Sequence, residues 1–120
     1  MYTKKAGFIV AVKGFHGKTM GSLSMIGKKD YREPVGNLYG GPVYHVPFGD
    51  AEAVERQLEI CETVGIGIAA VMMEPIQGEA GAIVPPDDFW PRIRAATRKH
   101  NVLLIADEVQ TGLGRTGKLW

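Results

Sequence analysis

Three continuous runs of apolar residues divide the chain, and each has the length of a β-strand. They span residues 7–12 (GFIVAV), 68–73 (IAAVMM) and 102–106 (VLLIA). Runs of this length, bounded by glycine, proline or polar residues, are typical of strands that are buried on both faces. A short strand at residues 43–46 is also consistent with the pattern.

Segments with helical periodicity separate these runs. Residues 51–64 form the clearest segment, and Asp50 is suited to cap its N-terminus because its carboxylate can accept a backbone N–H. Another helix is expected from residue 89, where Asp87 or Asp88 is the candidate cap. Its apolar side chains fall on one face and its basic side chains on the other, so it should cover a sheet.

The alternation of strands and helices predicts an α/β fold, with a mostly parallel sheet between two layers of helices (three-layer αβα). A weaker helix is expected at residues 18–26, followed by a long loop at residues 30–49 that is rich in glycine and proline. Loops of that length in compact chains are usually functional or pack on a partner. With neither repeat nor linker, residues 1–120 are interpreted as a single unit.

The composition is that of a soluble globular protein and limits its partners. Hydrophobic residues make up 45% and charged residues 22%, and the net charge is +1 with the basic residues scattered. This gives no electrostatic footprint for nucleic acid or an anionic membrane, and no apolar run approaches the roughly 20 residues of a membrane span. Cys61, the single cysteine, is interpreted as a packing residue. We expect a cytoplasmic protein with no nucleic-acid or membrane partner.

Polar and aromatic residues follow each of the three apolar runs. The first run leads to Phe15 and His16, the second to Glu74, and the third to Asp107 and Gln110. Ligands of open α/β sheets bind outside the carboxyl ends of the strands, which lie at one edge when the strands are parallel. These side chains are therefore predicted to converge on a ligand site.

Asp107 is the most informative of these residues. It follows five apolar residues, so its carboxylate should be partly desolvated and in need of a partner. That partner could be an arginine, a metal ion or a protonated ring nitrogen. On spacing alone, a structural salt bridge to a nearby basic residue is as well supported as a role in ligand binding. On spacing alone, Glu74 and Glu79 are as well interpreted as solvated acids of a surface loop as they are as residues of a site. His16 could be a base or a ligand, but a histidine after a strand is more often a positioning residue. No cluster has metal-ligand spacing, so no metal site is predicted.

A phosphate-binding loop is the main competing motif. Gly17, Lys18 and Thr19 are similar to the end of such a loop, and residues 103–108 (LLIADE) to the magnesium-binding strand of nucleotide hydrolases. The motif requires a glycine five positions before Gly17, where this chain has Val12. A nucleotide hydrolase is therefore disfavoured.

Four motifs in this order resemble the class III aminotransferases, which are fold type I pyridoxal-phosphate enzymes. The motifs are residues 15–17 (FHG), 74–79 (EPIQGE), 107–112 (DEVQTG) and 114–117 (GRTG). The family includes ornithine, acetylornithine, 4-aminobutyrate and putrescine aminotransferases. The segments VYHVPFGD and VPPDDFW resemble the putrescine and ornithine-like branch most.

The resemblance implies pyridoxal 5'-phosphate as cofactor and assigns roles to the residues at matching positions. Asp107 would be the catalytic carboxylate that pairs with the pyridine nitrogen and keeps it protonated, which makes the ring an electron sink. Phe15 would stack on one face of the ring and Val109 would pack against the other. Gln110 would hydrogen-bond the phenolic oxygen.

The resemblance also implies how the rest of the site and the substrates are arranged. His16 and Glu74 would support the cofactor pocket, and Glu79 would pair with an arginine from farther along the chain to gate substrate carboxylates. The enzyme would transfer the terminal amine of a diamine or ω-amino acid to a 2-oxo acid. It would be a homodimer or a higher homo-oligomer.

Two parts of the family's cofactor site have no counterpart in residues 1–120. The covalent lysine anchor lies downstream of the Asp107 motif in the family, and the phosphate-binding turn lies upstream of the first strand. The family's small domain is also missing. We therefore expect this chain to be an internal fragment of the large domain, inactive on its own. The other alternative is a non-catalytic remnant of such an enzyme, whose exposed strand edges serve only in assembly.

Overall fold

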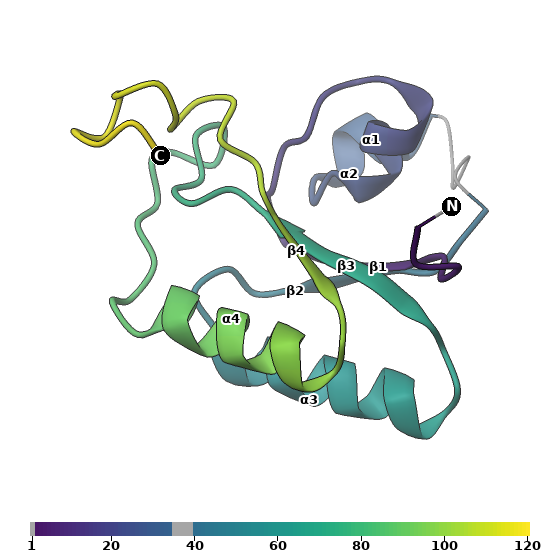
Figure 1. The fold of residues 1–120 in the computed structure, drawn as a ribbon. Coiled ribbons are helices and arrows are strands. Elements are labelled where there is room, and N and C mark those ends of the chain that lie inside the picture. Colours follow the sequence, from purple (N-terminus) through teal and green to yellow (C-terminus); the bar gives the residue numbers. More distant parts are fainter. Residues whose placement is uncertain (1, 35–39) are drawn as a thin grey trace.

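The computed structural model describes residues 2–34 and 40–120, in which four strands alternate with helices (Figure 1). In chain order they are β1 (Gly7–Ala11), α1 (Met20–Met25), α2 (Lys29–Arg32), β2 (Val43–Val46), α3 (Ala51–Thr63), β3 (Ile68–Met73), α4 (Phe89–Lys99) and β4 (Leu103–Ala106). Residue 1 and residues 35–39, which belong to the predicted long loop, lie outside the described part.

All four strands pair in parallel in one sheet with the order β2-β1-β3-β4. The short strand at residues 43–46 is thus present as β2, at the edge of the sheet beside β1. Its sequence signal was weak because only Val46 of its four residues is buried. In contrast, β3 lies between two strands, and all but one of its residues are buried.

Helices lie on both sides of the sheet, which confirms the predicted α/β architecture (Figure 1). The long helices α3 and α4 cover one face, and the short helices α1 and α2 lie on the other. The chain passes from β1 outward to β2, returns past β1 to β3, and continues to β4. The order therefore reverses beside β1, and such switch points are where α/β sheets open a crevice for ligands.

The main hydrophobic core fills the space between the sheet and the helices α3 and α4. Phe89 is fully buried there, and its ring meets Phe48 and Trp90 edge-on, each at a centroid distance of 5.4 Å. Val54, Leu58 and Ile93 are also buried in this core. Cys61 is 1% exposed, in agreement with its interpretation as a packing residue.

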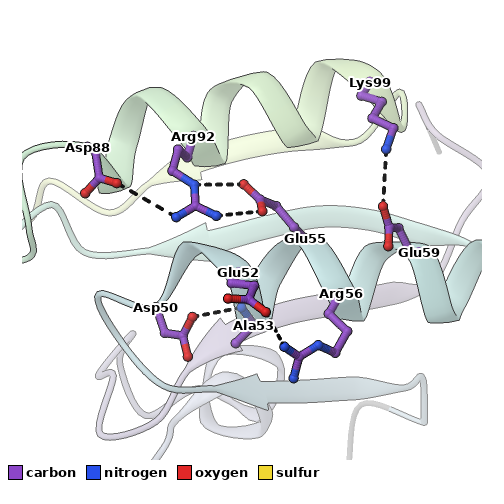
Figure 2. Close-up of polar contacts among 9 residues, drawn as sticks. All are labelled: Asp50, Glu52, Ala53, Glu55, Arg56, Glu59, Asp88, Arg92 and Lys99. Carbon is purple, nitrogen blue, oxygen red and sulfur yellow. Dashed lines mark hydrogen bonds and ion pairs between the residues drawn. The ribbon is translucent and has the colours of Figure 1, made fainter.

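Opposite charges line the neighbouring surfaces of α3 and α4 (Figure 2). The guanidinium of Arg92 donates two hydrogen bonds to Glu55, from Nε at 3.1 Å and from Nη2 at 2.7 Å. These hydrogen bonds raise the pKa of Arg92. Lys99 donates to Glu59 at 3.2 Å, about one turn farther along α3. The pairs link the two helices at the surface, but exposed ion pairs of this kind add little stability.

The two predicted helix caps differ in the structure. Asp50 caps α3 as expected, because its Oδ1 accepts the backbone N–H of Ala53 at 2.9 Å. Asp88 occupies the N-cap position of α4, but its side chain accepts no cap hydrogen bond, and its carboxylate lies 3.8 Å from Arg92 instead (Figure 2).

The substitution Asp50→Ala should lower the free energy of unfolding by about 1 kcal/mol, because it leaves a helix N–H without its partner. Asp88→Ala is the matched control and should change stability much less, since no cap hydrogen bond is lost. Urea unfolding followed by circular dichroism measures both. Equal losses for the two variants would contradict the assignment of Asp50 as the cap.

Candidate functional site

The loops at the carboxyl ends of β1, β3 and β4 surround a pocket of about 160 Å³. Its lining is Phe15, His16, Gly17, Glu74, Asp107, Val109 and Gln110. Parallel strands place these loops at the same edge of the sheet, so residues more than 90 positions apart become neighbours. The pocket holds every residue that the sequence singled out for cofactor binding, whereas Glu79 is not part of its lining.

Asp107 and His16 form the polar centre of the pocket. Nδ1 of His16 lies 2.7 Å from Oδ2 of Asp107, with the imidazole side chain 0% and the carboxylate 11% exposed. The other oxygen, Oδ1, accepts the backbone N–H of Val109 at 3.2 Å. Asp107 therefore has a basic partner within the chain, as the salt-bridge interpretation required. Buried carboxylates need such partners, and His16 orients this one toward the pocket.

His16 also carries a buried polar atom without a partner in the described part of the chain. Its Nε2 is fully enclosed and makes no hydrogen bond. Buried polar atoms are hydrogen-bonded in most native proteins, and an unpaired one needs an explanation. Because this nitrogen is enclosed, it does not face the open space of the pocket.

Glu74 is buried rather than solvated, so its interpretation as a surface acid is wrong. It is 5% exposed at the end of β3. Its carboxylate accepts two backbone N–H groups, from Phe15 to Oε1 and from Gly78 to Oε2, both at 2.9 Å. The sequence showed a polar residue after an apolar strand but could not show that both oxygens face inward.

Phe15 is a half-buried residue of the pocket lining, and its ring packs against Tyr31, which is not part of that lining. The two rings meet edge-on at a centroid distance of 5.9 Å. Nζ of Lys18 lies 4.7 Å from the centroid of the Tyr31 ring, a cation–π contact. Lys18 is thus directed onto an aromatic ring, which gives no support to the phosphate-binding loop.

Val109 and Gln110 lie in the turn after β4. The Val109 side chain borders the pocket but is 92% exposed, so it projects largely into solvent. Gln110 packs over Gly78 so closely that a Cβ atom there would lie 2.3 Å from Oε1 of Gln110. A larger residue at this position would force the exposed Gln110 side chain to turn away from the loop after β3.

Glu79 lies beside the pocket and pairs with Lys28. Nζ of Lys28 donates to the backbone carbonyl of Glu79 at 3.2 Å and lies 3.8 Å from its Oε2. The Glu79 side chain is 43% exposed. The sequence gave no sign of the partner Lys28, because nothing in the spacing of two loop residues 51 positions apart indicates that they meet.

Gln77 belongs to the motif at residues 74–79, but the sequence assigned it no role of its own. It is 1% exposed, and its Nε2 donates to the backbone carbonyl of Val12 at 2.9 Å. The bond ties the loop after β3 to the end of β1. A buried glutamine inside a loop has no periodic signal, and the flanking glycine and proline masked it.

His45 on β2 does not line the pocket and is held in place by the backbone. Its Nε2 lies 3.1 Å from the backbone carbonyl of Ile26. Burial is the main cause that lowers the pKa of His45, and the positive charge of Arg32 lowers it further. The neutral imidazole is therefore the form favoured in the folded chain.

Two other features are absent from the part of the chain that the structure describes. No group of three or more His, Cys, Asp or Glu residues within 2–34 and 40–120 could hold a metal ion. None of the helices found there is long and apolar enough to cross a membrane.

The fold and the pocket define a chain of the α/β class with a polar pocket at its switch point. The family model for class III aminotransferases matches residues 1–120, so the chain belongs to this family. The family assignment made from the four sequence motifs is thereby confirmed. Pyridoxal phosphate is the cofactor of these enzymes.

Similar proteins agree with this assignment. The putrescine aminotransferase of Pectobacterium atrosepticum is 48% identical over 113 residues, which are 94% of this chain and 24% of that protein. An ornithine aminotransferase of Toxoplasma gondii superposes with a TM-score of 0.84 at 34% identity, over 97% of this chain and 26% of that protein's chain. Partial occupancy of PLP is described at the active site of that structure. A transaminase from the marine bacterium Virgibacillus gives 0.82 at 33% identity, over 98% and 27%. The chain therefore spans about a quarter of the length of these relatives.

Proposed function

We propose that these residues form the ring-binding part of the active site in a pyridoxal-phosphate-dependent transaminase. The observation that carries the proposal is the Asp107 carboxylate, 11% exposed and held by His16 at the carboxyl edge of the sheet. A carboxylate in that setting is suited to a cationic partner, and a protonated pyridine nitrogen is one.

The residues in the pocket fit the cofactor's ring. Asp107 would hold a proton on the ring nitrogen, and His16 would keep that carboxylate in place. Phe15 offers an aromatic surface, and Gln110 offers an amide donor for the phenolic oxygen. When bound, pyridoxal phosphate withdraws electrons from the substrate carbon beside the transferred nitrogen. The largely exposed side chain of Val109 would become covered when it contacts the second face of the ring.

The substrates that we propose are a terminal amine, from a diamine or an ω-amino acid, and a 2-oxo acid as its acceptor. The likeness to a putrescine aminotransferase and to an ornithine aminotransferase supports this choice. Glu79 would exchange its contact with Lys28 for a pair with an arginine from farther along the chain. This exchange would control how substrate carboxylates bind. A cytoplasmic homodimer or higher homo-oligomer is the proposed working form.

We further propose that residues 1–120 alone do not transaminate. Eight lysines occur in the chain, and none is among the described residues that line the pocket. The covalent anchor of the cofactor would therefore have to come from outside this segment, as the family resemblance implies. Without it the segment would hold the cofactor only by non-covalent contacts.

The experiment compares the 120-residue chain with the complete gene product that contains it. Both are mixed with pyridoxal phosphate, and amine transfer from putrescine or ornithine to 2-oxoglutarate is assayed. We expect transfer by the complete gene product and none by the 120-residue chain. Transfer by neither, or phosphate release from ATP, would overturn the proposed reaction. Full turnover by the short chain would overturn its proposed inactivity.

A further inference from the structure

Glu74 occupies an unusual position between two loops of the pocket. It follows β3, and its buried carboxylate accepts one backbone N–H from the loop after β1 and one from its own loop. The donors are Phe15 and Gly78, and both distances are 2.9 Å. No ion pair to Glu74 occurs within residues 2–34 and 40–120, so these two N–H groups are the partners that stabilise its carboxylate there.

This pairing suits Glu74 to hold backbone rather than to exchange protons. A buried carboxylate is tolerated when its oxygens are hydrogen-bonded, and here each oxygen already has a donor. Hydrogen bonds from neutral donors to a charged group are also stronger than those between neutral groups. The carboxylate therefore acts as a bridge that fixes the distance between the two loops.

Both ends of this bridge lead to walls of the pocket. At one end, the backbone of Phe15 carries the aromatic ring that borders the cavity. At the other end, Gly78 lies against the side-chain amide of Gln110, where a Cβ atom would be 2.3 Å from Oε1. Any shift of Gly78 therefore moves the surface on which Gln110 rests.

We propose that Glu74 is a positioning residue that sets the spacing between the Phe15 ring and the Gln110 amide, and thereby the fit of the pocket to a flat aromatic cofactor. The proposal rests on the proposed function, because the spacing matters to the pyridoxal-phosphate ring. It assigns to Glu74 no contact with the reacting atoms. Its effect on the cofactor passes through two backbone N–H groups.

The test uses Glu74→Gln in the complete gene product. Glutamine keeps the shape but turns one acceptor oxygen into an N–H donor that faces a backbone N–H. The dissociation constant of pyridoxal phosphate, measured by equilibrium dialysis, should rise about tenfold or more, because one buried hydrogen bond is replaced by two opposed donors. Asp87→Asn, an exposed acid-to-amide change outside the pocket, should leave the constant unchanged.

Kinetics separate a positioning role from a direct one. With saturating cofactor, Glu74→Gln should keep the shape of the wild-type pH profile, since no proton passes through this carboxylate. A variant that binds the cofactor as tightly as wild type would overturn the proposal. So would a pH profile that loses one of its limbs, because it would make Glu74 a group that exchanges protons with the reactants.

Amide hydrogen exchange tests the bridge without the cofactor. In the cofactor-free protein, the amides of Phe15 and Gly78 should exchange faster in Glu74→Gln than in wild type. If the variant does not fold, the wild-type amides decide: both should exchange more slowly than that of Leu113 in the exposed C-terminal loop. Equal rates would overturn the bridge. A wild-type protein that shows protected amides but binds no pyridoxal phosphate would refute the proposed function and leave the bridge standing.

Discussion

Replacing Asp107 with asparagine should reduce transamination by the complete gene product by about a hundredfold or more. Removing one partner of a buried, hydrogen-bonded charge pair costs about 2–5 kcal/mol, and each 1.4 kcal/mol is a factor of ten. Asparagine can still accept the N–H of Val109 through Oδ1, so the turn after β4 should keep its shape. What is lost is the negative charge that would hold a proton on the ring nitrogen.

The measurement is kcat/KM together with the dissociation constant of pyridoxal phosphate. Asp87→Asn is the control, since this acid is exposed and lies outside the pocket lining. We expect the control to match wild type in both quantities. Wild-type kcat/KM in Asp107→Asn would show that the carboxylate is not the partner of the ring nitrogen, and the proposed role of Asp107 would have to be abandoned.

Replacing Phe89 with alanine should destabilise the fold by about 3–5 kcal/mol, the usual cost of deleting a buried aromatic ring. The ring is 0% exposed and meets Phe48 and Trp90 edge-on, each at a centroid distance of 5.4 Å. Because it lies at the start of α4, its loss also loosens the packing of that helix on the sheet. The total stability of a domain is only about 5–15 kcal/mol, so the change removes a large share of it.

Thermal unfolding measures this effect. For a domain of about 100 residues, 1 kcal/mol shifts the midpoint by roughly 4–8 °C, so Phe89→Ala should lower it by more than about 10 °C. Val84→Ala, at a side chain that is 68% exposed, is the control and should leave the midpoint nearly unchanged. A similar midpoint for Phe89→Ala and wild type would contradict the central place of this ring in the core.

The sequence was sufficient to predict the elements that make the core. β3 lies between two other strands, and its continuous apolar run is the direct consequence of burial on both faces. The helix α3 was found with its cap because Asp50 and a periodic apolar face are local features. In contrast, α2 was assigned to a loop, since its four residues (KDYR) have no apolar stripe and none is buried.

The candidate site was predictable only in outline. Parallel strands place their carboxyl ends together, so the meeting of Phe15, Glu74 and Asp107 followed from the order of strands and helices. The contacts between them did not follow, because they depend on how side chains turn at the ends of strands. The pair formed by His16 and Asp107 joins residues 91 positions apart. No local pattern specifies such a pair.

The central claim is that Asp107 faces the ring nitrogen of pyridoxal phosphate in this pocket. The most direct measurement is the ¹⁵N spectrum of cofactor labelled at the pyridine nitrogen and bound to the complete gene product. We predict a nitrogen that is protonated in the wild-type protein and loses its proton in Asp107→Asn. A bound cofactor whose ring nitrogen carries no proton in the wild-type protein would contradict the claim.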